Sequence, residues 1–97
     1  MDFETRPALV IQNDIANRHS PITIVAAVTS QIAGERYPTE VEVHPPEGGL
    51  TKPSVVLLNQ IRSVDNRRLV AKLGRLKPES LRRVDRALQL SLGLVNV

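Results

Sequence analysis

The side chains that could do chemistry in this chain are few, and their spacing disfavours several kinds of site. There is no cysteine, and the two histidines, His19 and His44, stand alone in segments predicted to be loops. His, Asp and Glu never recur at the spacing of a metal site, so neither a metal nor a cofactor is expected. The serines lack a Gly-x-Ser-x-Gly context, and no glycine-rich loop leads from a predicted strand into a helix. Serine-hydrolase, metal-dependent and nucleotide-binding chemistry are therefore disfavoured.

Arginine and hydroxyl side chains remain, and together they suit the phosphodiester of RNA. RNA carries its own nucleophile, the 2′-hydroxyl, so a protein needs only to position it and to stabilise charge on the phosphate oxygens. The guanidinium fork matches a phosphate bidentately and stays charged at ordinary pH. Such a reaction leaves a 2′,3′-cyclic phosphate. A mechanism in which His19 and His44 act as base and acid is the alternative.

The charge of the chain is divided unevenly between its halves. Residues 1–50 hold three basic and seven acidic side chains, a balance of −4, whereas residues 51–97 hold ten basic and three acidic ones, a balance of +7. Such an asymmetry suits a polyanion or an acidic protein as partner of the C-terminal half. A solvated basic surface without a partner is the alternative interpretation.

Five short strands are predicted from the hydrophobic pattern. Continuous apolar runs over residues 8–11, 22–28 and 55–58 are typical of buried strands. Strict alternation over 39–43 is typical of a half-exposed strand, and it directs Val41 and Val43 inward. Leu69, Ala71 and Leu73 alternate with Val70 and Lys72, which suggests one more strand that Gly74 ends. The prolines and glycines of residues 45–49 predict a turn between the third and fourth strands.

A helix is predicted over residues 78–92. Leu81, Val84, Leu88 and Leu92 recur at helical spacing, and arginines occupy the other side. Pro78 suits the first helical position and Gly93 fits just past the end. Strands in meander order with one terminal helix predict an antiparallel α+β fold, and 97 residues suffice for a single domain, residues 1–97. Without a leader or an apolar run of about 18 residues, the chain is expected to be soluble and cytoplasmic.

Three segments resemble the MazF/PemK family of type II toxins. They are residues 6–14 (RPALVIQND), 25–30 (VAAVTS) and 57–65 (LLNQIRSVD). The resemblance covers nearly the whole chain, and it implies a small SH3-like antiparallel β-barrel of the CcdB/MazF type with a C-terminal α-helix. It further implies a homodimer without a membrane segment, which cuts single-stranded mRNA at short sequences without metal. A cognate acidic antitoxin, similar to MazE, would block the RNA groove.

The resemblance also implies the roles of particular residues. The family's catalytic arginine and threonine correspond here to Arg6 and Thr29. Arg6 is expected to neutralise the phosphate rather than to abstract a proton, because a neutral guanidine is vanishingly rare. The Thr29 hydroxyl is expected to donate to the developing charge. The expected RNA-binding residues are Asn13, Ser30, Gln60 and Arg62.

One departure from the family pattern keeps an alternative function open. Members usually carry a strand and a Gly-rich, Glu-Gln-containing loop before the Arg-Pro pair, whereas here only residues 1–5 precede Arg6. We therefore expect the substrate loop to be missing and a sheet edge to be unpaired. A noncatalytic or weakly active dimer that keeps the antitoxin-binding surface is the alternative to a ribonuclease. A remoter third alternative is a protein that poisons DNA gyrase by binding to it, as the related CcdB fold does.

Overall fold

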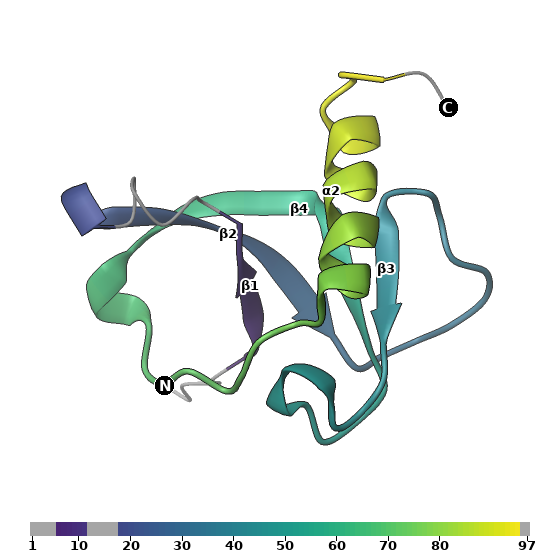
Figure 1. Ribbon diagram of the computed structural model, residues 1–97, viewed down its shortest axis with the longest axis horizontal. Helices are drawn as coiled ribbons and strands as arrows, with labels where there is room; N and C mark the ends of the chain where they lie inside the picture. Colours follow the sequence, from purple (N-terminus) through teal and green to yellow (C-terminus); the bar gives the residue numbers. More distant parts are fainter. Residues whose placement is uncertain (1–5, 12–17, 96–97) are drawn as a thin grey trace.

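A curled antiparallel sheet forms the body of the protein, and one helix packs against it (Figure 1). The computed structural model describes residues 6–11 and 18–95. Its strands are β1 (Ala8–Val10), β2 (Ile22–Thr29), β3 (Glu40–Val43) and β4 (Ser54–Asp65), in the order β1-β2-β4-β3. Two 3₁₀ turns, η1 (Glu47–Gly49) and η2 (Asn66–Arg68), precede and follow β4, and helix α2 (Pro78–Ser91) follows. The predicted antiparallel α+β fold with a C-terminal helix is confirmed, the sheet curling as half of a barrel.

The fourth strand is much longer than predicted. Residues 55–58 were expected to form it, yet β4 continues to Asp65. The extension is polar and exposed at Asn59, Gln60 and Arg62, so it lacks the continuous apolar signal of a buried strand. Pairing with β2 stabilises it instead, from Ala26 opposite Ile61 to Ile22 opposite Asp65. A partner distant in sequence therefore determined the length of this strand.

An irregularity in the β2–β4 pairing bends the sheet. Ala26 pairs with Ile61, but the next residue, Ala27, pairs with Leu57, so β4 carries extra residues at this point. Extra residues on one strand bend it and increase its twist. Leu58 within this bulge is fully buried, whereas Asn59 and Gln60 are exposed. The bulge thus anchors β4 in the core and presents Gln60 to solvent.

The prediction of a fifth strand over residues 69–73 is wrong. The segment is a connection between η2 and α2 that forms no strand, and Leu69, Val70 and Leu73 are exposed. Alternation alone does not make a strand, because a strand needs a neighbouring edge to pair with. Both edges of β4 are already occupied, one by β2 and the other by β3.

Helix α2 begins and ends close to the predicted positions, but its buried face differs from the predicted stripe. Pro78 is at its start and Gly93, with φ +71°, follows its end. Ser80, Val84 and Ala87 are buried against β3 and β4, whereas the predicted stripe members Leu81 and Leu92 are exposed. These small buried residues allow the helix to lie close to the sheet. The shared core contains Ala26, Val41, Val43, Val56, Leu58, Val84 and Ala87.

Glu47 connects turn η1 to the start of α2. Its Oε2 accepts a hydrogen bond of 2.9 Å from the backbone N–H of Lys77, the residue just before the helix. Hydrogen bonds from the Ser80 side chain and from the Lys77 backbone lower the pKa of Glu47 below its usual 4.5. A carboxylate beside a helix N-terminus is also favoured by the helix dipole. The ionised form of Glu47 therefore stabilises the folded chain.

Glu47→Gln is expected to destabilise the chain at neutral pH. Because the folded-state pKa of Glu47 lies below its unfolded value, its contribution is fully present above the usual pKa. That contribution disappears as the pH falls through the folded-state pKa. Urea unfolding of both proteins between pH 7 and pH 3 measures the difference in unfolding free energy, which should shrink to near zero at the acid end. A difference that grows on acidification would contradict this assignment.

The backbone of η1 crosses the backbone of the 69–77 connection in direct contact, and glycines lie on both sides of the crossing. A Cβ added at Gly49, where φ is +71°, would lie 2.0 Å from the Leu73 carbonyl oxygen. A Cβ added at Gly74 would lie 2.8 Å from the Gly48 carbonyl carbon. Backbone atoms cannot yield as a flexible side chain can, so this crossing requires glycine on both sides.

Gly49→Ala is therefore expected to cost about 2 kcal/mol or more of unfolding free energy. The matched control is Gly34→Ala, because Gly34 has nearly the same φ, +70°, but nothing within 4 Å of an added Cβ. Its cost should be about 1 kcal/mol, the penalty of positive φ alone. Thermal and urea unfolding of the two variants give the comparison. Equal losses would show that the crossing contributes nothing beyond backbone strain.

Candidate functional site

A pocket of about 800 Å³ lies where β1, β2 and β4 meet. The residues before and at the start of β1 form one wall, the end of β2 forms a second, and the bulged part of β4 forms a third. Its described lining is Arg6, Pro7, Ala8, Val25, Ala27, Val28, Thr29, Ser30, Gln31, Leu57, Gln60, Ile61 and Arg62. Apolar side chains therefore form much of the surface, and polar groups stand around it.

The pocket brings together five of the six predicted site residues. Arg6, Thr29, Ser30, Gln60 and Arg62 all line it. Asn13 lies outside the residues that the structure describes. The five come from three separate segments, so their convergence follows from strand pairing and not from proximity along the chain.

Antiparallel pairing explains how Arg6 and Thr29 reach the same pocket. Ala8 pairs with Ala27, and the register runs in opposite directions along the two strands. Continued by two residues, it sets Arg6 opposite Thr29. The Arg-Pro pair thus lies at the outer end of β1, beside the last residue of β2. The β1–β2 register, continued past the start of β1, is what brings them together.

A local turn orients the Thr29 hydroxyl. Its Oγ1 accepts a hydrogen bond of 3.1 Å from the backbone N–H of Gln31, the turn that serine and threonine favour after a strand. With the oxygen used as acceptor, the hydroxyl hydrogen can donate to a ligand. Gln31 was not among the site residues predicted from the sequence. Its position directly after the Thr-Ser pair was the one sign that it belongs to the site.

The electrostatics of the pocket suit an anion. Arg6 and Arg62 contribute two positive charges, and the described lining includes neither an acidic side chain nor a histidine. Guanidinium groups hold their charge throughout the ordinary pH range. Hydroxyl and amide groups from Thr29, Ser30 and Gln60 add neutral hydrogen-bonding partners. The pocket therefore holds both positive charge that suits a phosphate and a side-chain amide that suits the edge of a base.

The histidine alternative gains no support from the arrangement. His44 follows β3, and its Nε2 lies 2.7 Å from Oε2 of Glu42. Neither His44 nor His19 is among the described residues that line the pocket. Within the described ranges, no group of three or more His, Cys, Asp or Glu residues is placed to hold a metal ion.

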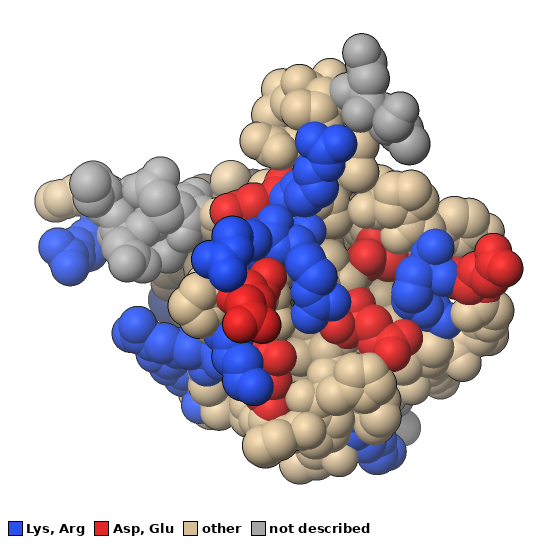
Figure 2. Space-filling view, turned by 45° about the vertical axis from the view of Figure 1, so that its right-hand side comes forward, with Lys and Arg blue, Asp and Glu red and all other residues tan. Residues whose placement is uncertain are grey.

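A second, smaller hollow of about 330 Å³ separates β3 from α2. Two of its arginines already have partners: Arg36 Nε lies 3.5 Å from Glu42 Oε1, and Arg83 Nη1 donates to the Glu42 backbone carbonyl at 3.2 Å. Figure 2 shows basic side chains running along α2 with acidic ones beside them. The basic C-terminal half is therefore not a uniformly positive face here.

The fold and the larger pocket define a small half-barrel protein with a cationic, hydroxyl-bearing site for an anionic ligand. Residues 2–92 match the model of a known family, described as the PemK-like, MazF-like toxin of type II toxin–antitoxin systems. The chain belongs to this family, and the resemblance found in its sequence is confirmed. It is a type II toxin by descent.

Individual relatives agree with this assignment. Endoribonuclease EndoA of Bacillus subtilis (strain 168) is 50% identical over 91 residues, which are 94% of this chain and 78% of the relative. An endoribonuclease solved in complex with its cognate antitoxin, from a mycobacterial species, has a TM-score of 0.83 at 25% identity, over 98% of this chain and 87% of that one. A MazE–MazF structure from Deinococcus radiodurans has a TM-score of 0.77 at 33% identity, over 93% of this chain and 87% of that one.

Helices able to cross a membrane are absent from residues 6–11 and 18–95, the parts of the chain that the structure describes.

Proposed function

We propose that this chain is an endoribonuclease toxin that cuts single-stranded mRNA in the cytoplasm without a metal ion. The observation that carries the proposal is the single pocket shared by Arg6, Thr29, Ser30, Gln60 and Arg62. The printed name of the 50% identical relative, an endoribonuclease, supports the same activity. The nucleophile of the proposed reaction is the RNA's own 2′-hydroxyl.

Arg6 and Thr29 are assigned to the reacting phosphate. The 2′-oxygen attacks phosphorus, the bond to the 5′-oxygen of the next nucleotide breaks, and a 2′,3′-cyclic phosphate and a free 5′-hydroxyl result. The attacking hydroxyl loses its proton to water, and the leaving oxygen gains one. Arg6 stabilises the negative charge that builds on the non-bridging oxygens, and the Thr29 hydroxyl donates to one of them. The chain supplies electrostatic stabilisation rather than a proton acceptor.

The remaining polar residues are assigned to binding. Gln60, exposed at the β4 bulge, offers a donor and an acceptor to a base edge, and Arg62 offers its charge to a neighbouring phosphate. Ser30 lies directly after Thr29 and is assigned to the same stretch of the RNA backbone. Asn13 remains assigned to RNA from the resemblance alone.

Two partners complete the proposal. Structures of the family include an endoribonuclease with its cognate antitoxin and MazE–MazF pairs, and we extend an acidic antitoxin to this chain. We also extend the homodimer that the resemblance implies. The exposed Leu92 and Leu94 after α2 offer apolar surface of the kind that such an interface covers.

The direct test is incubation of the purified chain with a long single-stranded RNA in EDTA. Discrete cuts, mapped by primer extension and carrying 2′,3′-cyclic ends, are the expected result. Cuts that require added Mg²⁺ would contradict the metal-independent mechanism. RNA left intact by a chain that is folded, judged by circular dichroism, would instead support the noncatalytic binding module.

Gln31→Pro is expected to slow cleavage by about five- to tenfold, because it removes the N–H that holds Thr29 Oγ1. A hydrogen bond is worth about 1 kcal/mol net, which corresponds to roughly that factor in rate. Gln31→Ala keeps the N–H and is the matched control. Single-turnover cleavage rates of both variants decide the question. Equal slowing would assign the effect to the Gln31 side chain and would refute the role of the turn.

A further inference from the structure

Four basic side chains gather at the end of the β2–β4 pair that lies away from Thr29. Arg18 and His19 come just before β2, and Arg67 and Arg68 belong to η2, which follows β4. All four side chains are exposed. Figure 1 shows the two segments at the same end of the molecule. We call this group, Arg18, His19, Arg67 and Arg68, the η2 corner.

Hydrogen bonds join the two segments of the η2 corner. The backbone N–H of Asn66 donates to the Pro21 carbonyl at 2.8 Å. The Asn66 side chain donates through Nδ2 to the Ser20 carbonyl at 2.9 Å, although 46 positions separate these two residues along the chain. The basic side chains therefore extend from two backbone segments that are held side by side. A ligand meets an arrangement that is already formed, which lowers the entropic cost of binding.

The η2 corner carries more positive charge than its neighbouring carboxylate neutralises. Arg67 Nη2 donates to Asp65 Oδ2 at 2.9 Å, and Arg67 Nε donates to Oδ1 at 3.1 Å. Hydrogen bonds from Arg67, with a smaller effect of the charge of Arg68, lower the pKa of Asp65. Among the described residues, neither Arg18 nor Arg68 has a salt bridge of its own. Two exposed guanidinium groups therefore remain for an anionic ligand.

The η2 corner lies along the same two strands as the pocket. Arg62, which lines the pocket, pairs with Val25, and Asp65, the residue before η2, pairs with Ile22. Three residue pairs separate these positions, which is about 10 Å at the rise of a strand. An RNA that occupies the pocket and continues along β2 and β4 therefore reaches the corner within a few nucleotides.

The chemistry of the corner suits single-stranded RNA. An arginine fork matches a phosphate bidentately, and a guanidinium plane or an imidazole ring can also stack on an unpaired base. We propose that the η2 corner is a second RNA-binding subsite, which holds the phosphates of nucleotides on one side of the cut. The inference rests on the proposed function of the pocket and adds to it a contact that positions the RNA without reading its sequence.

The first arm of the test measures binding of a fluorescent single-stranded RNA by anisotropy at several salt concentrations. It uses the full chain with Arg6→Ala, so that the RNA is not cut. Adding Arg18→Gln with Arg68→Gln should weaken binding roughly three- to tenfold. Loss of two phosphate contacts should also reduce the slope of log affinity against log salt concentration by about 1.4.

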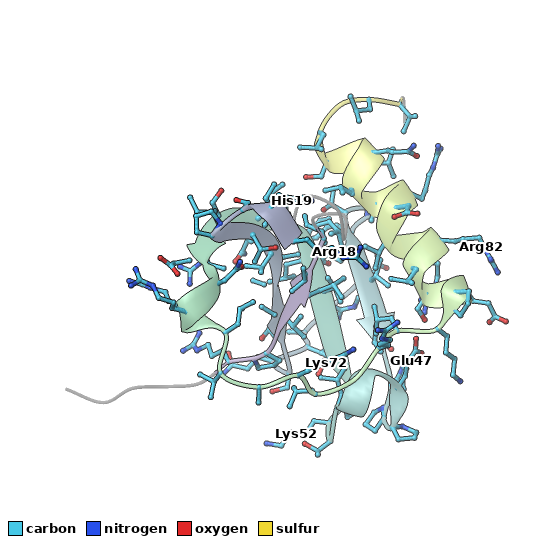
Figure 3. The ribbon with its side chains drawn as sticks, turned by 60° about the vertical axis from the view of Figure 1, so that its left-hand side comes forward. Arg18, His19, Glu47, Lys52, Lys72 and Arg82 are labelled. Carbon is cyan, nitrogen blue, oxygen red and sulfur yellow. The ribbon has the colours of Figure 1, made fainter. Side chains whose placement is uncertain are left out.

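The matched control is Lys52→Gln with Arg82→Gln, which removes the same charge elsewhere. Figure 3 shows Lys52 and Arg82 well away from Arg18. This control should keep the slope of the parent chain. All four substituted side chains are exposed, so both double variants should melt at the parent temperature.

The second arm measures cleavage by the chain with Arg6 intact. Its substrates are a short RNA and the same RNA extended by four nucleotides at its 5′ end or at its 3′ end. One of the two extensions should raise kcat/KM, because the corner lies to one side of the pocket. Arg18→Gln with Arg68→Gln should abolish that gain and cleave the short RNA at the parent rate.

Each contrary outcome has its own meaning. Equal salt slopes for the corner variant and its control would overturn the subsite and leave the proposed function of the pocket standing. Poly-glutamate that competes as strongly as RNA of equal charge would assign the corner to any polyanion, which would overturn it as an RNA subsite. Absence of RNA binding by the parent chain itself would overturn both the subsite and the proposed function.

Discussion

Arg6→Ala is expected to reduce the RNA cleavage rate of this chain by about 100- to 1,000-fold, the range found when one preorganised donor to a developing negative charge is removed. Arg6 lines the pocket that also holds Thr29, and the described lining offers only Arg62 as a second cation. Arg62 lies on β4 opposite Val25, four residues along β2 from Thr29, so it cannot simply replace Arg6. The loss should fall on the chemical step.

Arg6→Lys separates charge from geometry. Lysine keeps the positive charge but presents a single ammonium instead of a planar fork, so it should recover only part of the lost rate. Arg82→Ala is the matched control, because it removes one arginine from the exposed face of α2, away from either hollow. Single-turnover cleavage at saturating RNA, with circular dichroism of each variant, makes the measurement. Parent-like cleavage by folded Arg6→Ala would refute the proposed role.

Leu58→Ala is expected to have the largest effect on stability, about 2–5 kcal/mol of unfolding free energy. Leu58 is fully buried, belongs to the core shared by the sheet and α2, and lies within the β4 bulge. Truncation would leave a cavity at the point where the sheet bends. For a chain of this size, such a loss lowers Tm by at least about 10 °C and uses a large part of a typical domain stability.

Leu81→Ala is the control for this truncation. Leu81 is 43% exposed on α2, so the same change in side chain should cost less than about 1 kcal/mol. Urea unfolding followed by circular dichroism gives both values. Because Leu58 and the pocket residue Gln60 share the bulge, Leu58→Ala should also reduce RNA binding at temperatures where it remains folded. Equal destabilisation by the two variants would contradict the core that the structure describes.

The bulge links the fold to the site. It is the point where the register of β4 against β2 changes, and its residues extend from the buried Leu58 to the exposed Gln60. A regular strand would continue the alternation of faces without a break. The extra residues let neighbouring positions serve the core and the pocket. Bulges beside functional sites commonly re-aim side chains in this way.

The sequence by itself determined the features that depend on neighbours along the chain. The period of Val84 and Leu88 with Pro78 and Gly93 predicted α2 to within a residue, and the alternation at Val41 and Val43 predicted the buried face of β3. The turn around Gly48 and Gly49 followed from residue types that tolerate positive φ. The family-specific segments also identified the polar residues that the pocket gathers.

Only the tertiary structure decided which strands have partners. Residues 61–65 lacked a strand pattern yet pair with β2, whereas residues 69–73 were predicted as a strand and do not form one. Strand pairing joins segments far apart in sequence, so the partner is not encoded in the period of either one. The same reason applies to the site: Arg6 and Thr29 line one pocket because the β1–β2 register brings them there, and Gln60 joins them because β4 bulges.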